Sequence, residues 1–177
     1  NGTTMTEIEV RVEAPSDIRL VETNVPKEAV TRAAKSGINA VTVSTPVASM
    51  SFDASALSTI YEKASDEVKI IASKVEASSL SAEVRQVVGD RPVFDFSVTS
   101  GGKTISRFGG KVTVSVPYTP EKGEDINAII IYYINAEGKL ETVKDCIYNP
   151  DTGRALFNID HFSLYMVGYN KVSFKDV

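Results

Sequence analysis

The triplet His161-Phe162-Ser163 places the only histidine of the chain two residues before a hydroxyl side chain. A serine hydroxyl is a weak nucleophile near neutral pH, and it needs a base such as imidazole within hydrogen-bond reach. Attack of Ser163 on the Phe162 carbonyl would be an N-to-O acyl shift, and hydrolysis would then cut the chain between these two residues. Period-two alternation along a strand would put His161 and Ser163 on one face.

The same triplet also fits a structural role at a junction between a turn and a strand, where His161 and Ser163 bond to backbone groups. A strained peptide would supply further driving force for self-cleavage, and spacing without an observed strained backbone does not establish the mechanism. The structural interpretation is therefore favoured, and cleavage stays open as an alternative.

Four tyrosines form a second candidate site, an aromatic platform for sugar rings. They are Tyr132, Tyr133, Tyr165 and Tyr169. Tyr132 and Tyr133 are adjacent, so in a strand they point to opposite faces and only one of them is expected to be exposed. The chain has no tryptophan, which removes the strongest partner for sugar stacking.

Two other motifs are better explained as turns. Residues 101–104 resemble the end of a phosphate-binding loop, but the first glycine of that motif is missing and a strand-like segment follows where a helix is required. Residues 149–153 lack the alternating acidic residues and the terminal glutamate of a calcium loop. Asn, Pro, Asp and Gly are each favoured in turns for backbone reasons.

Composition excludes several classes of function. The chain has 177 residues, a net charge of -4, one histidine and one cysteine, Cys146. Clustered basic residues for nucleic acid are absent, and so are the ligands of a zinc site and the partner for an internal disulfide. The longest apolar run, residues 128–134, is far shorter than the roughly 20 residues that cross a bilayer. We therefore expect no cofactor, no metal, no nucleic-acid partner and no membrane insertion.

Hydrophobic periodicity predicts many short strands and few helices. Strands are expected at 6–12, 40–44, 47–52, 68–75, 93–99, 111–118, 128–135, 139–143 and 162–169. Helices are expected after a cap at Asn24, over residues 54–64 with Asp53 as cap, and over residues 82–88 ending at Gly89. Turn signals every 8 to 12 residues are typical of a sandwich.

The expected fold is thus mainly β, an antiparallel β-sandwich with two or three short helices. Residues 1–45 form an N-terminal strand-helix-strand lobe, or part of the same domain, and residues 46–171 form the sandwich. The chain starts without an initiator methionine or a signal peptide, and it stops on an alternating pattern, so it looks like a piece of something longer.

Two stretches resemble a β module of secreted surface proteins of Gram-positive bacteria. They are GDRPVFDFSVTSGGK at residues 89–103 and FGGKVTVSVPY at residues 108–118. Residues 127–134, 160–163 and 167–170 agree, so the resemblance covers roughly residues 40–170. In that family the module typically precedes S-layer homology repeats, which hold the protein on cell-wall polymers, and residues 172–177 resemble the start of a truncated repeat. The wall-binding residues of that repeat are not present in this chain.

The triplet at 161–163 also resembles the cleavage motif of self-cleaving ZU5 domains, and more loosely that of GAIN domains. This resemblance implies His161 as base, Ser163 as nucleophile and Phe162 as acyl donor.

These observations favour a non-catalytic extracellular structural or spacer module in a cell-wall-anchored or S-layer-associated bacterial surface protein. Its partners would be neighbouring modules of the same polypeptide. Two alternatives remain, a carbohydrate-binding module for cell-wall or plant polysaccharide that uses Tyr132, Tyr133 and Tyr165, and an autoproteolytic domain.

Overall fold

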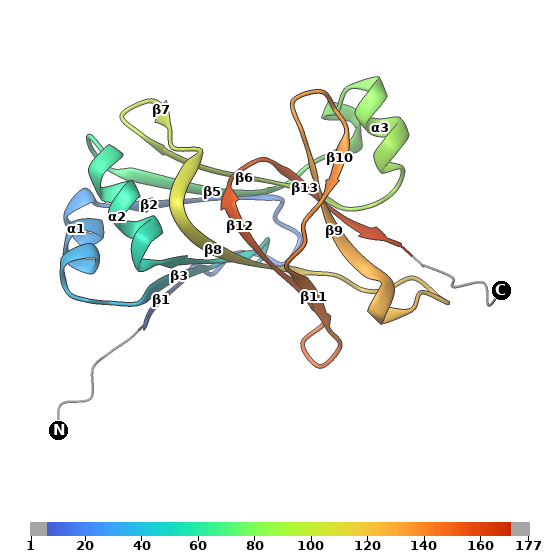
Figure 1. The fold of residues 1–177 in the computed structure, drawn as a ribbon, viewed down its shortest axis with the longest axis horizontal. Helices are drawn as coiled ribbons and strands as arrows, with labels where there is room; N and C mark the ends of the chain where they lie inside the picture. The colour runs from blue at the N-terminus through green and yellow to red at the C-terminus, as the bar shows by residue number, and fades with distance from the viewer. Residues whose placement is uncertain (1–6, 171–177) are drawn as a thin grey trace.

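The structure, a computed structural model, describes residues 7–170 as two packed β-sheets with three short α-helices (Figure 1). The predicted mainly β sandwich is confirmed. Within residues 7–170, neighbouring strands are antiparallel except for one pair, β1 with β3.

The first sheet has six strands. Their order is β1 (Glu7–Arg11), β3 (Ala40–Ser44), β4 (Ser49–Asp53), β8 (Arg107–Pro117), β12 (Arg154–His161) and β11 (Cys146–Asn149). The long strand β8 lies in its middle because residues far apart in the sequence pair with it, β4 on one side and β12 on the other.

The second sheet has six strands in a row and one short strand at its side. Their order is β10 (Leu140–Thr142), β9 (Ile129–Ile134), β13 (Leu164–Tyr169), β6 (Val93–Ser100), β5 (Val68–Lys74) and β2 (Leu20–Val25), and β7 (Lys103–Thr104) pairs with β6. The turn between β6 and β7 has positive φ at both Gly101 and Gly102, which confirms the predicted hairpin.

The three helices are α1 (Lys27–Lys35), α2 (Ala54–Lys63) and α3 (Ala82–Val88), and two 3-10 turns are η1 (Ala77–Ser79) and η2 (Ile126–Ala128). Asp53 caps α2 as predicted, since its carboxylate accepts a hydrogen bond from the Ala56 amide at 2.8 Å. The predicted cap at Asn24 is wrong. Asn24 lies within β2, and α1 starts after Pro26 without a side-chain cap.

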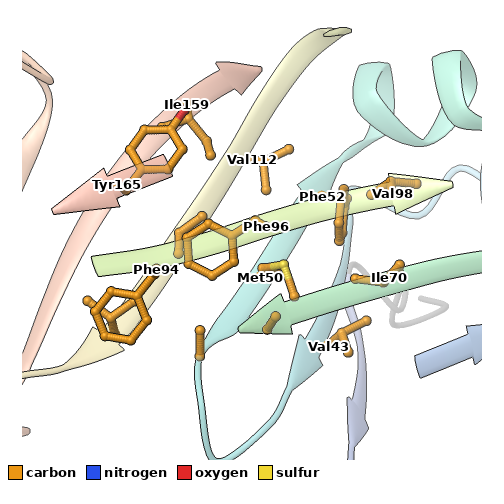
Figure 2. Close-up of a cluster of buried hydrophobic side chains, with 14 of the residues drawn as sticks. Val43, Met50, Phe52, Ile70, Phe94, Phe96, Val98, Val112, Ile159 and Tyr165 are labelled. Atoms are coloured by element: carbon orange, nitrogen blue, oxygen red, sulfur yellow. The ribbon is translucent and has the colours of Figure 1, made fainter. Parts of the chain in front are cut away.

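The main core fills the space between the sheets, because inward and outward side chains alternate along each strand. On β8, Val112, Val114 and Val116 are each fully buried. Figure 2 shows Phe94 and Phe96 of β6 pointing into the same interior. The alternation that predicted these strands therefore also identifies their buried faces.

A second, smaller cluster lies on the outer face of the second sheet, beneath α3. It contains Val84, Val88, Val93, Ile134 and Met166. This cluster explains why β9 is apolar on both faces, since its other face contributes Ile129 and Ile131 to the main core.

Residues 7–45 supply β1 and β3 to the first sheet and β2 to the second, and they add Val21, Val30 and Val43 to the main core. The predicted start of a wall-binding repeat, residues 172–177, lies outside the described residues. Within residues 7–170, no helix has both the length and the apolar character needed to cross a membrane.

Candidate functional site

The sequence candidate His161 lines an open hollow of about 670 Å³ at the side of the sandwich. The hollow is lined by Asp53, Gly110, Lys111, Tyr133, Val143, Lys144, Asp145, Asn158, Ile159, Asp160, His161 and Tyr165. It lies where β12 continues past β11, whose pairing with β12 begins at Cys146 opposite Phe157. A register shift between Ile159 and His161 changes the direction in which the last side chains of β12 point.

His161 is held by its neighbours in this hollow. Its Nδ1 lies 2.8 Å from an Asp160 carboxylate oxygen, and its ring meets the Tyr133 ring edge-on with centroids 5.1 Å apart. The hydrogen bond with His161 lowers the pKa of Asp160 below its usual value, against a smaller opposing effect of burial. His161 is thus paired with a carboxylate that stays ionised.

Ser163 does not line the hollow that contains His161. Its hydroxyl donates a hydrogen bond to the Ile134 carbonyl at 3.0 Å. It lines a different hollow, between α3 and the turn that follows β9. The chain passes from the first sheet to the second between His161, the last residue of β12, and Leu164, the first of β13. Period-two alternation therefore does not continue through this segment, and the structure does not bring His161 and Ser163 together.

Phe162 packs into an aromatic group of the main core. Its ring centroid lies 4.7 Å from that of Phe108, 6.0 Å from that of Phe96 and 6.2 Å from that of Phe52. All positive φ angles in residues 7–170 belong to glycines, so neither Phe162 nor Ser163 has a left-handed backbone. Phe162 therefore anchors the crossing between the sheets.

The predicted tyrosine platform is not assembled on one surface. Tyr165 is 1% exposed, and its hydroxyl donates to the His161 carbonyl at 2.6 Å. Tyr132 lies on the opposite face of β9, against the cluster beneath α3. Of the three, only Tyr133 is partly exposed in the hollow, where its hydroxyl donates to the Glu141 carboxylate. Burial raises the pKa of the Tyr165 hydroxyl.

Polar side chains that sequence reasoning missed complete the wall of the hollow. The Asn158 amide donates to Asp145 at 2.5 Å, and its carbonyl accepts from the Thr113 hydroxyl at 2.7 Å. The Lys111 amide donates to Asp53 at 2.9 Å. No local motif joins these residues, because they come from strands and loops that pair only in the folded chain. Together they offer carboxylate, amide and ammonium groups beside an aromatic ring.

A second polar cluster that the sequence did not predict lies outside the hollow that contains His161. The Arg91 guanidinium donates to the Tyr118 oxygen at 2.7 Å, and the Tyr118 hydroxyl donates to Glu124 at 2.7 Å. Arg91 also lies 2.5 Å from the other Glu124 oxygen and 5.9 Å from the centre of the Tyr169 ring. Burial, and then the hydrogen bond to Glu124, raise the pKa of Tyr118 to about 12.

Tyr169, the fourth tyrosine of the predicted platform, belongs to this second cluster. Its hydroxyl oxygen accepts a hydrogen bond from the Asp125 amide at 3.0 Å. Tyr169 therefore packs the end of β13 against the loop before β9, away from the hollow that contains His161.

Among the described residues, no group of three or more His, Cys, Asp and Glu side chains is arranged to hold a metal ion. A comparison of the chain with protein-family models and with curated proteins finds no match.

Proposed function

We propose that the domain is a non-catalytic structural module that spaces neighbouring modules of an extracellular bacterial surface protein, next to a cell-wall or S-layer anchor. The observation that carries this proposal is the position of the two terminal strands. β1 begins toward one end of the long axis, on the side of α1, and β13 ends toward the other (Figure 1). A single buried cluster containing residues from 21 to 167 connects the sheets between these ends, so the body would set a fixed separation.

The spacing role is tested by measuring the distance between its two ends. Spin labels at Glu7 and Asn170, both exposed, would be introduced into the full chain with Cys146→Ser, which removes the native thiol. Pulsed electron paramagnetic resonance should give one narrow distribution of distances between the two labels in buffer and a broad distribution in urea. A broad distribution in buffer would contradict a rigid spacer.

The non-catalytic part of the proposal predicts that the purified chain stays intact. The wild type and Ser163→Ala should each give a single full-length mass near 19.1 kDa under denaturing conditions. The physical reason is that the Ser163 hydroxyl donates a hydrogen bond to the Ile134 carbonyl, while the His161 ring is hydrogen-bonded to the Asp160 carboxylate. The two side chains lie in separate hollows. Loss of residues 163–177 from the wild type but not from the variant would establish self-cleavage and contradict this prediction.

A second candidate function, glycan binding, is favoured by the hollow that contains His161. Tyr133 offers an aromatic ring, and Asn158, Asp145 and Lys111 offer groups that hydrogen-bond sugar hydroxyls. Tyr133 replaces the three-tyrosine platform as the expected contact, since Tyr165 is buried and Tyr132 faces the other way.

The test is retention on insoluble bacterial cell wall and on insoluble plant polysaccharide. Glycan binding predicts saturable retention that Tyr133→Ala abolishes, while Tyr133→Phe, which keeps the ring, retains most of it. Tyr61→Ala on α2, outside the hollow, is the matched control and should bind as the wild type does. No retention on either material would contradict glycan binding, and the spacer role would be the one remaining proposal.

A further inference from the structure

We infer that the C-terminal strand β13 is a mechanical anchor of the domain, because it is held on both sides by hydrogen bonds that tension along the long axis loads in shear. This inference rests on the proposed spacer role, since only a module joined to neighbours at both ends is pulled in this way. The spacer role sets the separation of the two ends, and this inference adds resistance to a pulling force.

The C-terminal strand β13 is held on both sides. It pairs with β9 along its whole length, from Leu164 opposite Ile134 to Tyr169 opposite Ile129, and its first half also pairs with β6. Two further backbone hydrogen bonds lengthen these ladders. The Val167 amide donates to the Pro92 carbonyl at 3.1 Å on the β6 side, and the Asn170 amide donates to the Ala128 carbonyl at 2.8 Å on the β9 side.

The side chains of β13 are buried on both faces. Tyr165 and Val167 lie in the main core, and Met166 lies in the cluster beneath α3. Sliding β13 along its own axis would therefore break the ladders on both sides and expose apolar surface in the same event. This strand is the stronger of the two terminal anchors.

The N-terminal strand β1 is held on one side within the described residues. It pairs in parallel with β3, from Glu7 opposite Ala40 to Arg11 opposite Ser44, and the Val12 amide continues the ladder to the Ser44 carbonyl at 2.8 Å. Most of its side chains are exposed. We therefore expect β1 to detach first, at a lower force than the rest of the sandwich.

The direction of load follows from the arrangement in Figure 1. β1 starts on the side of α1 and runs inward, and β13 runs outward toward the opposite side. Tension on the chain pulls β1 backward and β13 forward, each along its own axis. Bonds along a sliding strand break together, whereas bonds along a peeled strand break one after another. Forced unfolding is governed by the barrier to unfolding, which shear raises.

The test is single-molecule force spectroscopy on the full chain with two pulling geometries. In the first, the handles are at the two chain ends. In the second, they are at the C-terminal end and at Lys122→Cys in the Cys146→Ser background. Lys122 is exposed in the loop before β9, on the side where Tyr169 contacts Asp125, so this geometry peels β13 from β9.

We expect the main unfolding event to need a higher force in end-to-end pulling than in peeling at the same loading rate, after a smaller first event that releases β1 and moves the load to β2. Val12→Pro removes the amide that bonds Ser44 and should weaken that first event. Glu13→Pro, one residue later and exposed, is the matched control and should leave it unchanged.

Equal forces in the two geometries would overturn the inference. Equal first events in Val12→Pro and Glu13→Pro would overturn the assignment of that event to β1. Either result is distinct from failure of the spacer role, which the distance measurement between Glu7 and Asn170 tests without any applied force.

Discussion

Arg91→Met is expected to lower the free energy of unfolding by about 3 kcal/mol at neutral pH. Arg91 is the only cation that contacts Glu124 within the described residues, and the Glu124 side chain is only 7% exposed. Removing the guanidinium leaves a buried carboxylate without its counter-charge, with the Tyr118 hydroxyl and the Glu121 amide as remaining donors. Urea denaturation of wild type and variant measures the difference.

The pH dependence of the free energy of unfolding is a second test of the ion pair between Arg91 and Glu124. Burial raises the pKa of Glu124, but the Tyr118 hydroxyl, the Glu121 amide and Arg91 outweigh this effect and hold it below its ordinary value of 4.5. A carboxylate with a lowered pKa in the folded state stabilises fully above its unfolded value, and the contribution is lost as the pH falls through the folded value.

The difference between wild type and Arg91→Met should therefore shrink as the pH is lowered below 4.5. Glu124→Gln, which cannot ionise, should show a weaker dependence on pH than the wild type in this range. A loss of stability in Arg91→Met that is the same at neutral and acidic pH would show that packing, and not the ion pair, is responsible.

Phe96→Ala is expected to cost about 3–5 kcal/mol, because it opens a cavity in the middle of the main core. Phe96 is 2% exposed, and its ring centroid lies 6.2 Å from that of Phe94, 6.0 Å from that of Phe162 and 6.1 Å from that of Tyr165 (Figure 2 for Phe94 and Tyr165). The free energy of unfolding in urea is again the measurement.

Two controls separate the cavity from general effects of substitution. Phe96→Leu keeps much of the volume and should cost less than half as much as alanine. Ile147→Ala removes a side chain that is 67% exposed on β11, and it should change stability by less than about 0.5 kcal/mol. Comparable losses in Ile147→Ala and Phe96→Ala would contradict the position of the core.

Elements with strong local signals could be predicted from the sequence. The helix predicted at residues 82–88 has those bounds, with Ser81 as cap and a positive φ at Gly89, because capping acts within one helical turn. The alternation at residues 111–118 identified the buried face of β8. In contrast, β2 was missed, since Leu20–Val25 carries polar residues that are accommodated at the edge of a sheet.

The candidate site was less predictable because its geometry depends on which sheet each strand joins. The sequence shows His161 and Ser163 two residues apart, but the crossing to the other sheet at Phe162 sends them to separate hollows. The contact between Arg91 and Glu124 likewise joins distant positions in the chain, and nothing local to either residue indicates the other.

The cluster beneath α3 has a consequence for how the molecule opens in solution. α3 packs on the outer face of the second sheet through Val84 and Val88, which belong to that small cluster and not to the core between the sheets. The helix can therefore lift away while the sandwich stays closed. Amide hydrogens of α3 would then exchange with solvent through local opening, whereas those in the centre of β8 would exchange only when the whole domain unfolds.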